Sequence, residues 1–144
     1  MRDLEKAKSL LFEEDLTLAV VKDGEVIFRS KDKGIKPMFI LATDLKEKAK
    51  DAALADRVIG KGAAILAGYI GIKEIYTDLI SQGGIERLDY YKIPYEMKNS
   101  CEYIKNRDQT DYCPIEKISM NIEDPLVLIE SIKEFFKKIS KGEV

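Results

Sequence analysis

The chain has 144 residues and a formal net charge of −2, with 45% hydrophobic and 35% charged residues. This length and balance predict one folded domain over residues 1–144 and exclude an intrinsically disordered chain. There is no domain-wide positive charge to bind a nucleic-acid backbone, and no apolar run approaches the ~20 residues of a membrane span. We therefore expect neither nucleic acid nor a membrane as a partner.

The amino-terminal residues 1–6 lack the apolar core of a signal peptide, so we expect a cytoplasmic protein. In that reducing compartment the two cysteines, Cys101 and Cys113, are expected to be free thiols. High charge together with few Gln and Asn residues is typical of proteins from thermophiles.

The first thirty residues predict a helix followed by a β-hairpin. Asp3 is expected to cap a helix whose apolar face holds Leu4, Ala7, Leu10 and Leu11. The apolar run 16–21 predicts a buried strand. Asp23-Gly24 is typical of a tight type I′ turn, and it leads to a return strand at residues 25–30.

The middle of the chain predicts helices. Pro37 suits the first turn of a helix that reaches Leu41 or Leu45, and residues 45–53 predict a further, charged helical piece. Asp56 is then expected to cap a helix that runs to about residue 69 or 70.

The second half predicts strands at residues 72–80 and 95–104, with a short helix over 85–91 between them. Cys113-Pro114 opens another short helix, and Asp124-Pro125 starts the last one with a cap and a proline at its first position. The apolar stripe of that last helix holds Leu128, Ile129, Ile132, Phe135, Phe136 and Ile139. A hairpin followed by alternating strands and helices predicts a three-layer α/β/α sandwich with a mixed β-sheet.

The stretch 55–64 (Ala-Asp-Arg-Val-Ile-Gly-Lys-Gly-Ala-Ala) combines small residues with one acid and one lysine at an expected helix start. Glycines inside a helix cost about 1 kcal/mol each relative to alanine, which suggests a steric reason for them. One interpretation is that Asp56 and Lys61 contact a ligand, with the positive end of the helix favouring an anion. The other is that the glycines merely pack the helix against the sheet and Lys61 is a surface residue.

Cys113 has two interpretations as well. A thiol at a helix amino terminus is activated as a nucleophile, and Glu116 could then serve as an acid or a base. Alternatively, Cys113 is a small buried residue and Glu116 is its partner in a capping box, which is a purely structural arrangement.

Three further residues are candidates for a role in a site or in the core. Ser81 ends a strand, where ligands often bind in α/β proteins, but it also suits a simple turn. Arg107 could hold a phosphate or a carboxylate, or it is an ordinary exposed loop arginine. Cys101 is expected to be buried filler on the apolar face of its strand.

The order of elements resembles the cytidine-deaminase-like fold. In detail the chain is similar to an uncharacterised bacterial and archaeal family, a domain of unknown function within that superfamily. The residues that carry the resemblance are Asp23-Gly24, Gly34-Ile35-Lys36-Pro37, the stretch 55–64, Asn106-Arg107 and Cys113-Pro114-Ile115-Glu116.

Deaminases of that superfamily hold zinc with an H-x-E or C-x-E motif on one core helix and P-C-x-x-C on the next. The resemblance places these motifs at residues 60–64 and 81–84, where this chain has no His, Cys or Glu. We therefore expect no metal and no cofactor. Relatives that lack zinc tend to bind nucleotide-like or pterin-like molecules in the same cleft, so the resemblance implies such a ligand.

The leading hypothesis is a zinc-free, deaminase-like domain that binds a small anionic, nucleotide-like ligand. The expected ligand-binding residues are Asp56, Lys61, Ser81 and Arg107, and any catalytic residues are expected to be Cys113 and Glu116. One alternative is a thiol-dependent redox or group-transfer enzyme that uses Cys113. Another is a non-enzymatic, self-associating interaction domain, since an exposed sheet edge favours a homo-oligomer.

Overall fold

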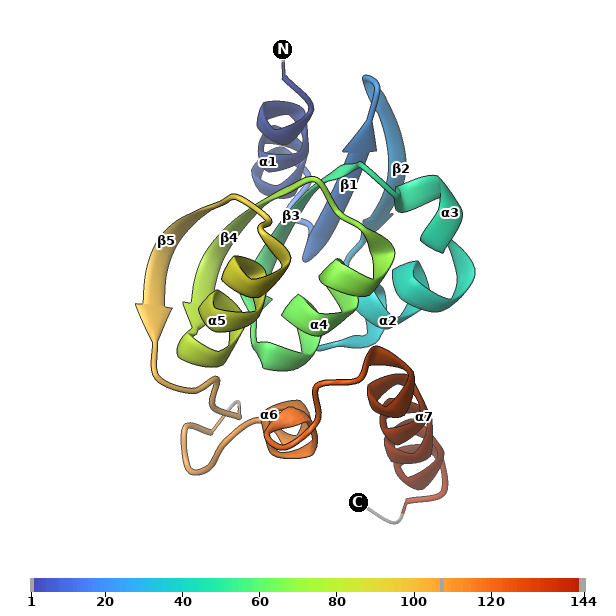
Figure 1. Cartoon of the computed structure of the whole chain (residues 1–144), viewed down its shortest axis with the longest axis vertical. Coiled ribbons are helices and arrows are strands. Elements are labelled where there is room, and N and C mark those ends of the chain that lie inside the picture. Colours follow the sequence, from blue (N-terminus) through green and yellow to red (C-terminus); the bar gives the residue numbers. More distant parts are fainter. Residues whose placement is uncertain (1, 107, 143–144) are drawn as a thin grey trace.

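A computed structural model describes residues 2–106 and 108–142. Its centre is a mixed five-stranded sheet in the order β2-β1-β3-β4-β5 (Figure 1). The strands are β1 (Leu18–Lys22), β2 (Glu25–Ser30), β3 (Ala53–Ile59), β4 (Glu74–Ser81) and β5 (Tyr95–Cys101). β1 runs antiparallel to both of its neighbours, whereas β3, β4 and β5 run parallel to one another.

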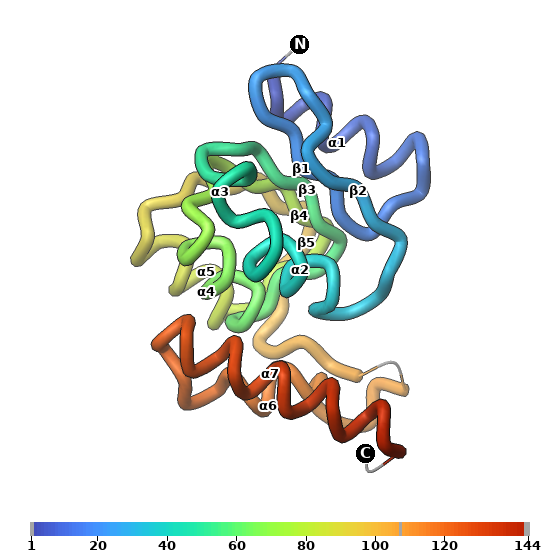
Figure 2. Tube along the Cα trace, turned by 90° about the vertical axis from the view of Figure 1, so that its right-hand side faces the viewer, coloured from blue at the N-terminus to red at the C-terminus, as the bar shows by residue number. Residues whose placement is uncertain are grey.

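Helices cover both faces of the sheet and its lower end. They are α1 (Asp3–Glu13), α2 (Lys36–Asp44), α3 (Lys46–Ala49), α4 (Lys61–Ile70), α5 (Gln82–Tyr91), α6 (Pro114–Ser119) and α7 (Pro125–Ser140). α1 lies alone on one face and α2 to α5 lie on the other, while α6 and α7 lie beyond the carboxyl ends of the parallel strands (Figure 2). The architecture is therefore an α/β sandwich with a mixed sheet. None of the described helices is long and apolar enough to cross a membrane.

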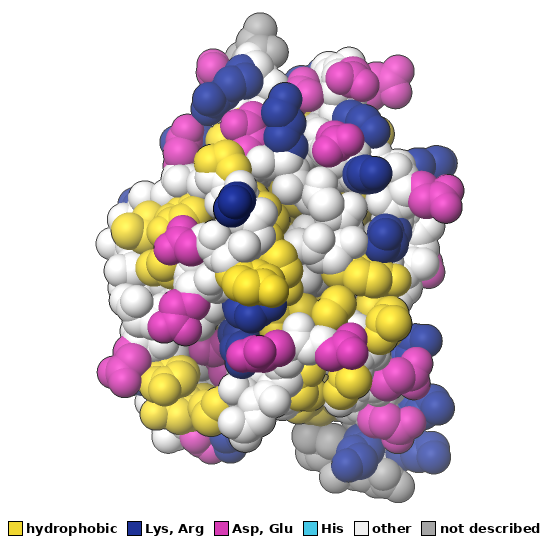
Figure 3. All heavy atoms as spheres, in the orientation of Figure 1, with side chains coloured by type: hydrophobic (Ala, Val, Ile, Leu, Met, Phe, Trp, Pro, Cys, Tyr) yellow, Lys and Arg dark blue, Asp and Glu magenta, His cyan; other side chains and the backbone are white. Residues whose placement is uncertain are grey.

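The alternation of side chains along the strands builds a core on each face. In β1, Leu18 and Val20 pack toward the helices α2 to α5, whereas Ala19 and Val21 pack toward α1. On the outer surface over α4 and α5, hydrophobic side chains gather near the centre, and Lys or Arg is interspersed with Asp or Glu around them (Figure 3).

The predicted hairpin is confirmed. Asp23 and Gly24 both have positive φ angles, 51° and 79°, as a type I′ turn requires. The prediction that Asp3 caps its own helix is wrong, because the cap position is Arg2. The Asp3 carboxylate instead accepts hydrogen bonds from the backbone N–H groups of Asp23 and Gly24, both at 2.9 Å, and so ties α1 to the hairpin.

The prediction of a helix from Asp56 is also wrong. Residues 53–59 form β3, the central strand of the sheet, and α4 begins only at Lys61 with Gly60 as its cap. Of the expected charged helical piece, only α3 is helical. The alanines, leucine and arginine of β3 have high helix propensity, but pairing with β1 and β4 satisfies the backbone of β3 on both edges, and this tertiary pairing overrides local preference.

Other expectations differ less from the structure. The Oδ1 atom of Asp124 accepts from the Leu126 N–H at 2.8 Å and Pro125 starts α7, so the predicted start of the last helix is confirmed. β5 ends at Cys101, and its five inner residues are exposed instead of half-buried. β5 is the edge strand, so it has a neighbour on one side only.

Candidate functional site

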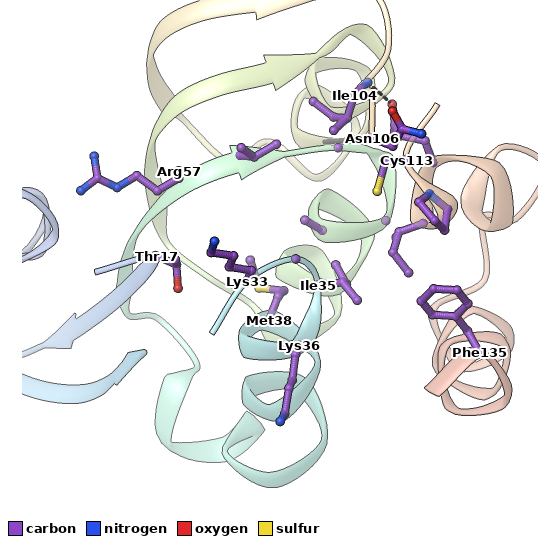
Figure 4. Close-up of a pocket in the computed structure, with 18 of the residues that line it drawn as sticks. Thr17, Lys33, Ile35, Lys36, Met38, Arg57, Ile104, Asn106, Cys113 and Phe135 are labelled. Carbon is purple, nitrogen blue, oxygen red and sulfur yellow. Dashed lines mark hydrogen bonds between the residues drawn. The ribbon is translucent and has the colours of Figure 1, made fainter. Parts of the chain in front are cut away.

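A cavity of about 600 Å³ lies beside the carboxyl end of β3 (Figure 4). Its walls come from the loop before α2, the end of β3, the start of α4, the segment that leads into α6, and one side of α7. Side chains from these elements and from the residue before β1 line it, among them Thr17, Lys33, Ile35, Met38, Asp56, Ala63, Cys113, Ile115, Phe135 and Phe136. The size and the largely apolar lining are typical of a site for a small organic molecule.

Asp56 supplies a carboxyl group in this lining. It stands in the central strand and shares its side of the sheet with Leu54, two residues earlier, which is fully buried. Burial raises the pKa of Asp56 to about 7, although backbone hydrogen bonds from Val58 and Arg57 oppose the shift. Near neutral pH the carboxyl group is therefore present in both forms and can donate or accept a hydrogen bond to a bound molecule.

Arg57, the next residue, points to the opposite face (Figure 4). Its guanidinium donates to the carbonyl oxygens of Leu11 and Leu16, both at 2.9 Å, and to Asp78 Oδ2 at 3.0 Å. It also lies 4.8 Å from the centre of the Phe12 ring. These contacts fasten α1 to β3, so the guanidinium is committed to the scaffold. No local sequence pattern reveals this role of Arg57, because its partners are distant in sequence.

Glu116 is buried and binds two backbone amides. Its Oε1 atom accepts from the Lys61 N–H at 3.2 Å, and its Oε2 atom accepts from the Ile104 N–H at 2.7 Å. The expected capping box with Cys113 is wrong, because the Cys113 N–H donates to the Ile104 carbonyl at 2.9 Å. Glu116 caps α4 from a different helix. Its carboxylate already lies at the amino terminus of α4, which disfavours an anionic ligand at that point.

The glycines of the 55–64 stretch permit this contact. A Cβ atom at Gly60 would lie 2.6 Å from Glu116 Oε1, and one at Gly62 would lie 3.0 Å from the Ile115 side chain. Both glycines therefore allow α6 to approach the start of α4. This supports the interpretation that the two glycines serve helix packing, although they pack against α6 and not against the sheet.

Lys61 and Ser81 do not line the cavity. The Lys61 ammonium donates to the Met120 carbonyl at 3.0 Å and borders a separate cleft beside α5. Ser81 is buried, and its hydroxyl accepts from the Gly84 N–H at 3.0 Å as the cap of α5. Arg107 lies outside the described residues. The lysines that line the cavity are instead Lys33, Lys36 and Lys105.

Cys113 lines the cavity, half-buried, at the cap position of α6, where its side chain makes no capping hydrogen bond. Cys101 lies at the end of β5, also half-buried, and burial with the nearby Glu116 charge raises the pKa of its thiol. Cys113 is thus the cysteine that faces the candidate site.

The comparisons with known proteins assign the family. The TM1506 model, described as a domain of unknown function (DUF1893), matches residues 6–136. The chain belongs to the DUF1893 family. It is also similar to the crystal structure of a DUF1893 family protein (TM1506) from Thermotoga maritima, with 25% sequence identity and a TM-score of 0.79 over 92% of this chain and 88% of that one. No curated protein matches the chain.

The helix starts at residues 60–64 and 81–84 lie against each other in this DUF1893 domain. A Cβ atom at Gly83 would lie 3.1 Å from Lys61 Cβ, so the lysine side chain fills the space between the two starts. Within residues 2–106 and 108–142, no three His, Cys, Asp or Glu side chains are grouped so that they could hold a metal ion.

Proposed function

We propose that the protein is a zinc-free, deaminase-like domain that binds a small anionic, nucleotide-like molecule in the cavity beside β3. The observation that carries this proposal is the Asp56 carboxyl group within a largely apolar cavity of about 600 Å³. The cavity lies at the carboxyl end of a parallel strand, which is where open α/β sheets bind their ligands.

The polar groups suit a heterocycle that carries an anionic substituent. A carboxyl group with a pKa near 7 can pair with the adjacent donor and acceptor atoms of a nucleobase-like ring. Phe135 and Phe136 offer apolar surface to the ring from α7. Lys33 and Lys105 lie in the same lining and would balance a phosphate or a carboxylate.

The deaminase-like part of the proposal is supported by the order of elements. A β1–β2 hairpin precedes the parallel units β3-α4-β4-α5-β5, and the starts of α4 and α5 lie side by side at the carboxyl ends of their strands. These starts are the positions to which the resemblance assigns the zinc motifs. Since they carry no zinc-binding side chains, we propose binding without zinc hydrolysis.

The test is calorimetric titration of the full chain with nucleobases, nucleosides and nucleoside mono- and diphosphates. We expect saturable binding of at least one of these, and weaker binding by the Asp56→Asn variant. Asp51→Asn is the matched control, because Asp51 is exposed in a turn and does not line the cavity. Absence of binding across the panel, or equal binding by Asp56→Asn, would contradict the proposal.

A second candidate function is thiol-dependent redox or group-transfer chemistry, favoured by the position of Cys113 on the cavity wall (Figure 4). Alkylation with iodoacetamide distinguishes it, because the Cys113 thiolate would displace iodide faster than the Cys101 thiol, whose pKa is raised. The Cys101→Ser and Cys113→Ser variants each retain one cysteine, so the alkylation rate of each variant belongs to the remaining thiol. Equal and slow reaction of both cysteines would exclude this candidate.

A further inference from the structure

We propose that the protein forms a symmetric dimer in which β5 pairs antiparallel with β5 of a second copy, with Met97 on the two-fold axis. This inference is independent of the cavity and of the ligand proposed for it. It extends the sheet across two chains and leaves the cavity walls unchanged.

The first observation is a free sheet edge. β5 is the last strand of the sheet, it has seven residues, and its five inner residues are exposed. The structure shows it along one side of the molecule (Figure 1), and none of the described strands pairs with its outer edge. Met97, at its centre, exposes 46% of its surface. An uninterrupted strand of this kind is a template for another strand.

The second observation is which backbone groups are free. The Pro94 carbonyl accepts from the Ile75 N–H, and the β4–β5 register pairs Ile75 with Tyr95 and Thr77 with Met97. In a parallel pair this pattern turns the even-numbered residues of β5 toward β4. The N–H and C=O groups of the odd-numbered residues therefore point outward, and Met97 is one of them.

The third observation is the charge pattern around Met97. With the two-fold axis at Met97, Glu96 lies directly opposite the partner's Lys98, and Lys98 lies opposite the partner's Glu96. Glu96 is exposed on the α1 side, where Arg2 donates to its Oε1 atom at 3.0 Å. Side chains alternate along a strand, so Lys98 lies on that same side. Opposite charges across an antiparallel pair stabilise it.

The neighbouring symmetric registers are unfavourable. An axis at Glu96 or at Lys98 would place two identical charges directly opposite each other. An axis at Asn99 would place Glu96 opposite the partner's Glu102. Like charges in facing positions destabilise strand pairs, so the sequence of β5 favours one register.

The opposite edge of the sheet is less suited to pairing. The register between β1 and β2 shifts at Val20 and Val21, which pair with Phe28 and Val26 and leave Ile27 without a partner. Such a bulge increases the local twist and disrupts the regular spacing of an edge. β5 has no such irregularity in its pairing with β4.

The test is sedimentation equilibrium of the full chain over a wide range of protein concentration. We expect a dimer for the wild type. Glu96→Lys and Lys98→Glu should each weaken self-association by about tenfold or more, since each places two like-charged pairs across the interface. An equimolar mixture of these two variants should recover a dimer, because the heterodimer pairs lysines only with glutamates.

The mixture separates interface effects from folding defects, because misfolded chains would not recover a dimer when combined. Met97→Pro is the second variant. It removes an N–H that points away from β4, so it should abolish the dimer while the circular dichroism spectrum stays unchanged. A monomeric wild type, single variants that dimerise like the wild type, or a mixture that stays monomeric would each overturn the proposal.

Discussion

The Oε1 atom of Glu116 lies only 2.6 Å from the position that a Cβ atom of residue 60 would take, so residue 60 has to be glycine for α6 to reach α4. The same oxygen caps α4 through the Lys61 N–H. The contact between Glu116 and the start of α4 thus holds α6 and the segment before it in place, and that segment forms one wall of the cavity.

Gly60→Ala should destabilise the protein by about 1–3 kcal/mol, because the methyl group overlaps the carboxylate of Glu116. Gly60 has a φ of −95°, which alanine adopts freely, so the cost comes from the contact and not from the backbone. Urea denaturation measures it. In a Glu116→Ala background the same substitution should cost clearly less, and an equal cost there would contradict this explanation.

Glu116→Gln should lower the free energy of unfolding by about 1–3 kcal/mol, because the amide NH₂ group would face a backbone N–H and leave a buried donor unsatisfied. Denaturant titration of the two proteins checks this. Glu123→Gln is the control, since Glu123 is exposed and should give a change close to zero. Equal effects of the two substitutions would argue against the capping role.

Asp56 should make the protein less stable as the pH rises from about 4 to about 7. The pKa of Asp56 is raised from 3.8 to about 7 in the folded state, so over this interval the folded chain holds a proton that the unfolded chain has lost. The loss of stability should level off above pH 7. Asp56→Asn should flatten this part of the profile, which denaturation at pH 5 and pH 8 would show. Parallel profiles for the two proteins would contradict the raised pKa.

Arg57→Ala should destabilise the protein by about 2–4 kcal/mol, because the guanidinium hydrogen bonds to the Leu11 and Leu16 carbonyls and to the Asp78 carboxylate are all lost together. Arg29→Ala is the matched control. Arg29 also pairs with an acid, Glu14, but their side chains are 48% and 39% exposed, so its loss should cost less than about 1 kcal/mol. Thermal unfolding of the two variants gives the comparison.

The sequence was informative where the signal was local. The Asp23-Gly24 turn and the Asp124-Pro125 helix start are fixed by neighbouring residues, and both are confirmed. β3 was missed because its alanines and its short apolar run are equally compatible with a helix, and only pairing on both edges makes it a strand.

The candidate site was predicted in part. Asp56, Cys113 and Glu116 were chosen from separate local patterns, and the structure brings all three to one cavity. Lys61 was expected beside Asp56 because both were assigned to one helix. In the structure Asp56 lies in β3 and Lys61 starts α4. The Asp56 side chain therefore lines the cavity, whereas the Lys61 side chain borders the separate cleft beside α5. The Glu116 carboxylate accepts hydrogen bonds from the N–H groups of Lys61 and Ile104. Both contacts join residues far apart in the chain, so the spacing of residues in the sequence does not predict them.

Asp56 and Arg57 are adjacent in β3 and both border the cavity, yet the Arg57 guanidinium reaches away from it and holds α1 in place. A single peptide unit therefore connects the layer that would recognise a ligand with the layer that anchors the sheet from behind. A shift of α1 along the sheet would break the hydrogen bonds of Arg57, the residue next to the cavity's carboxyl group.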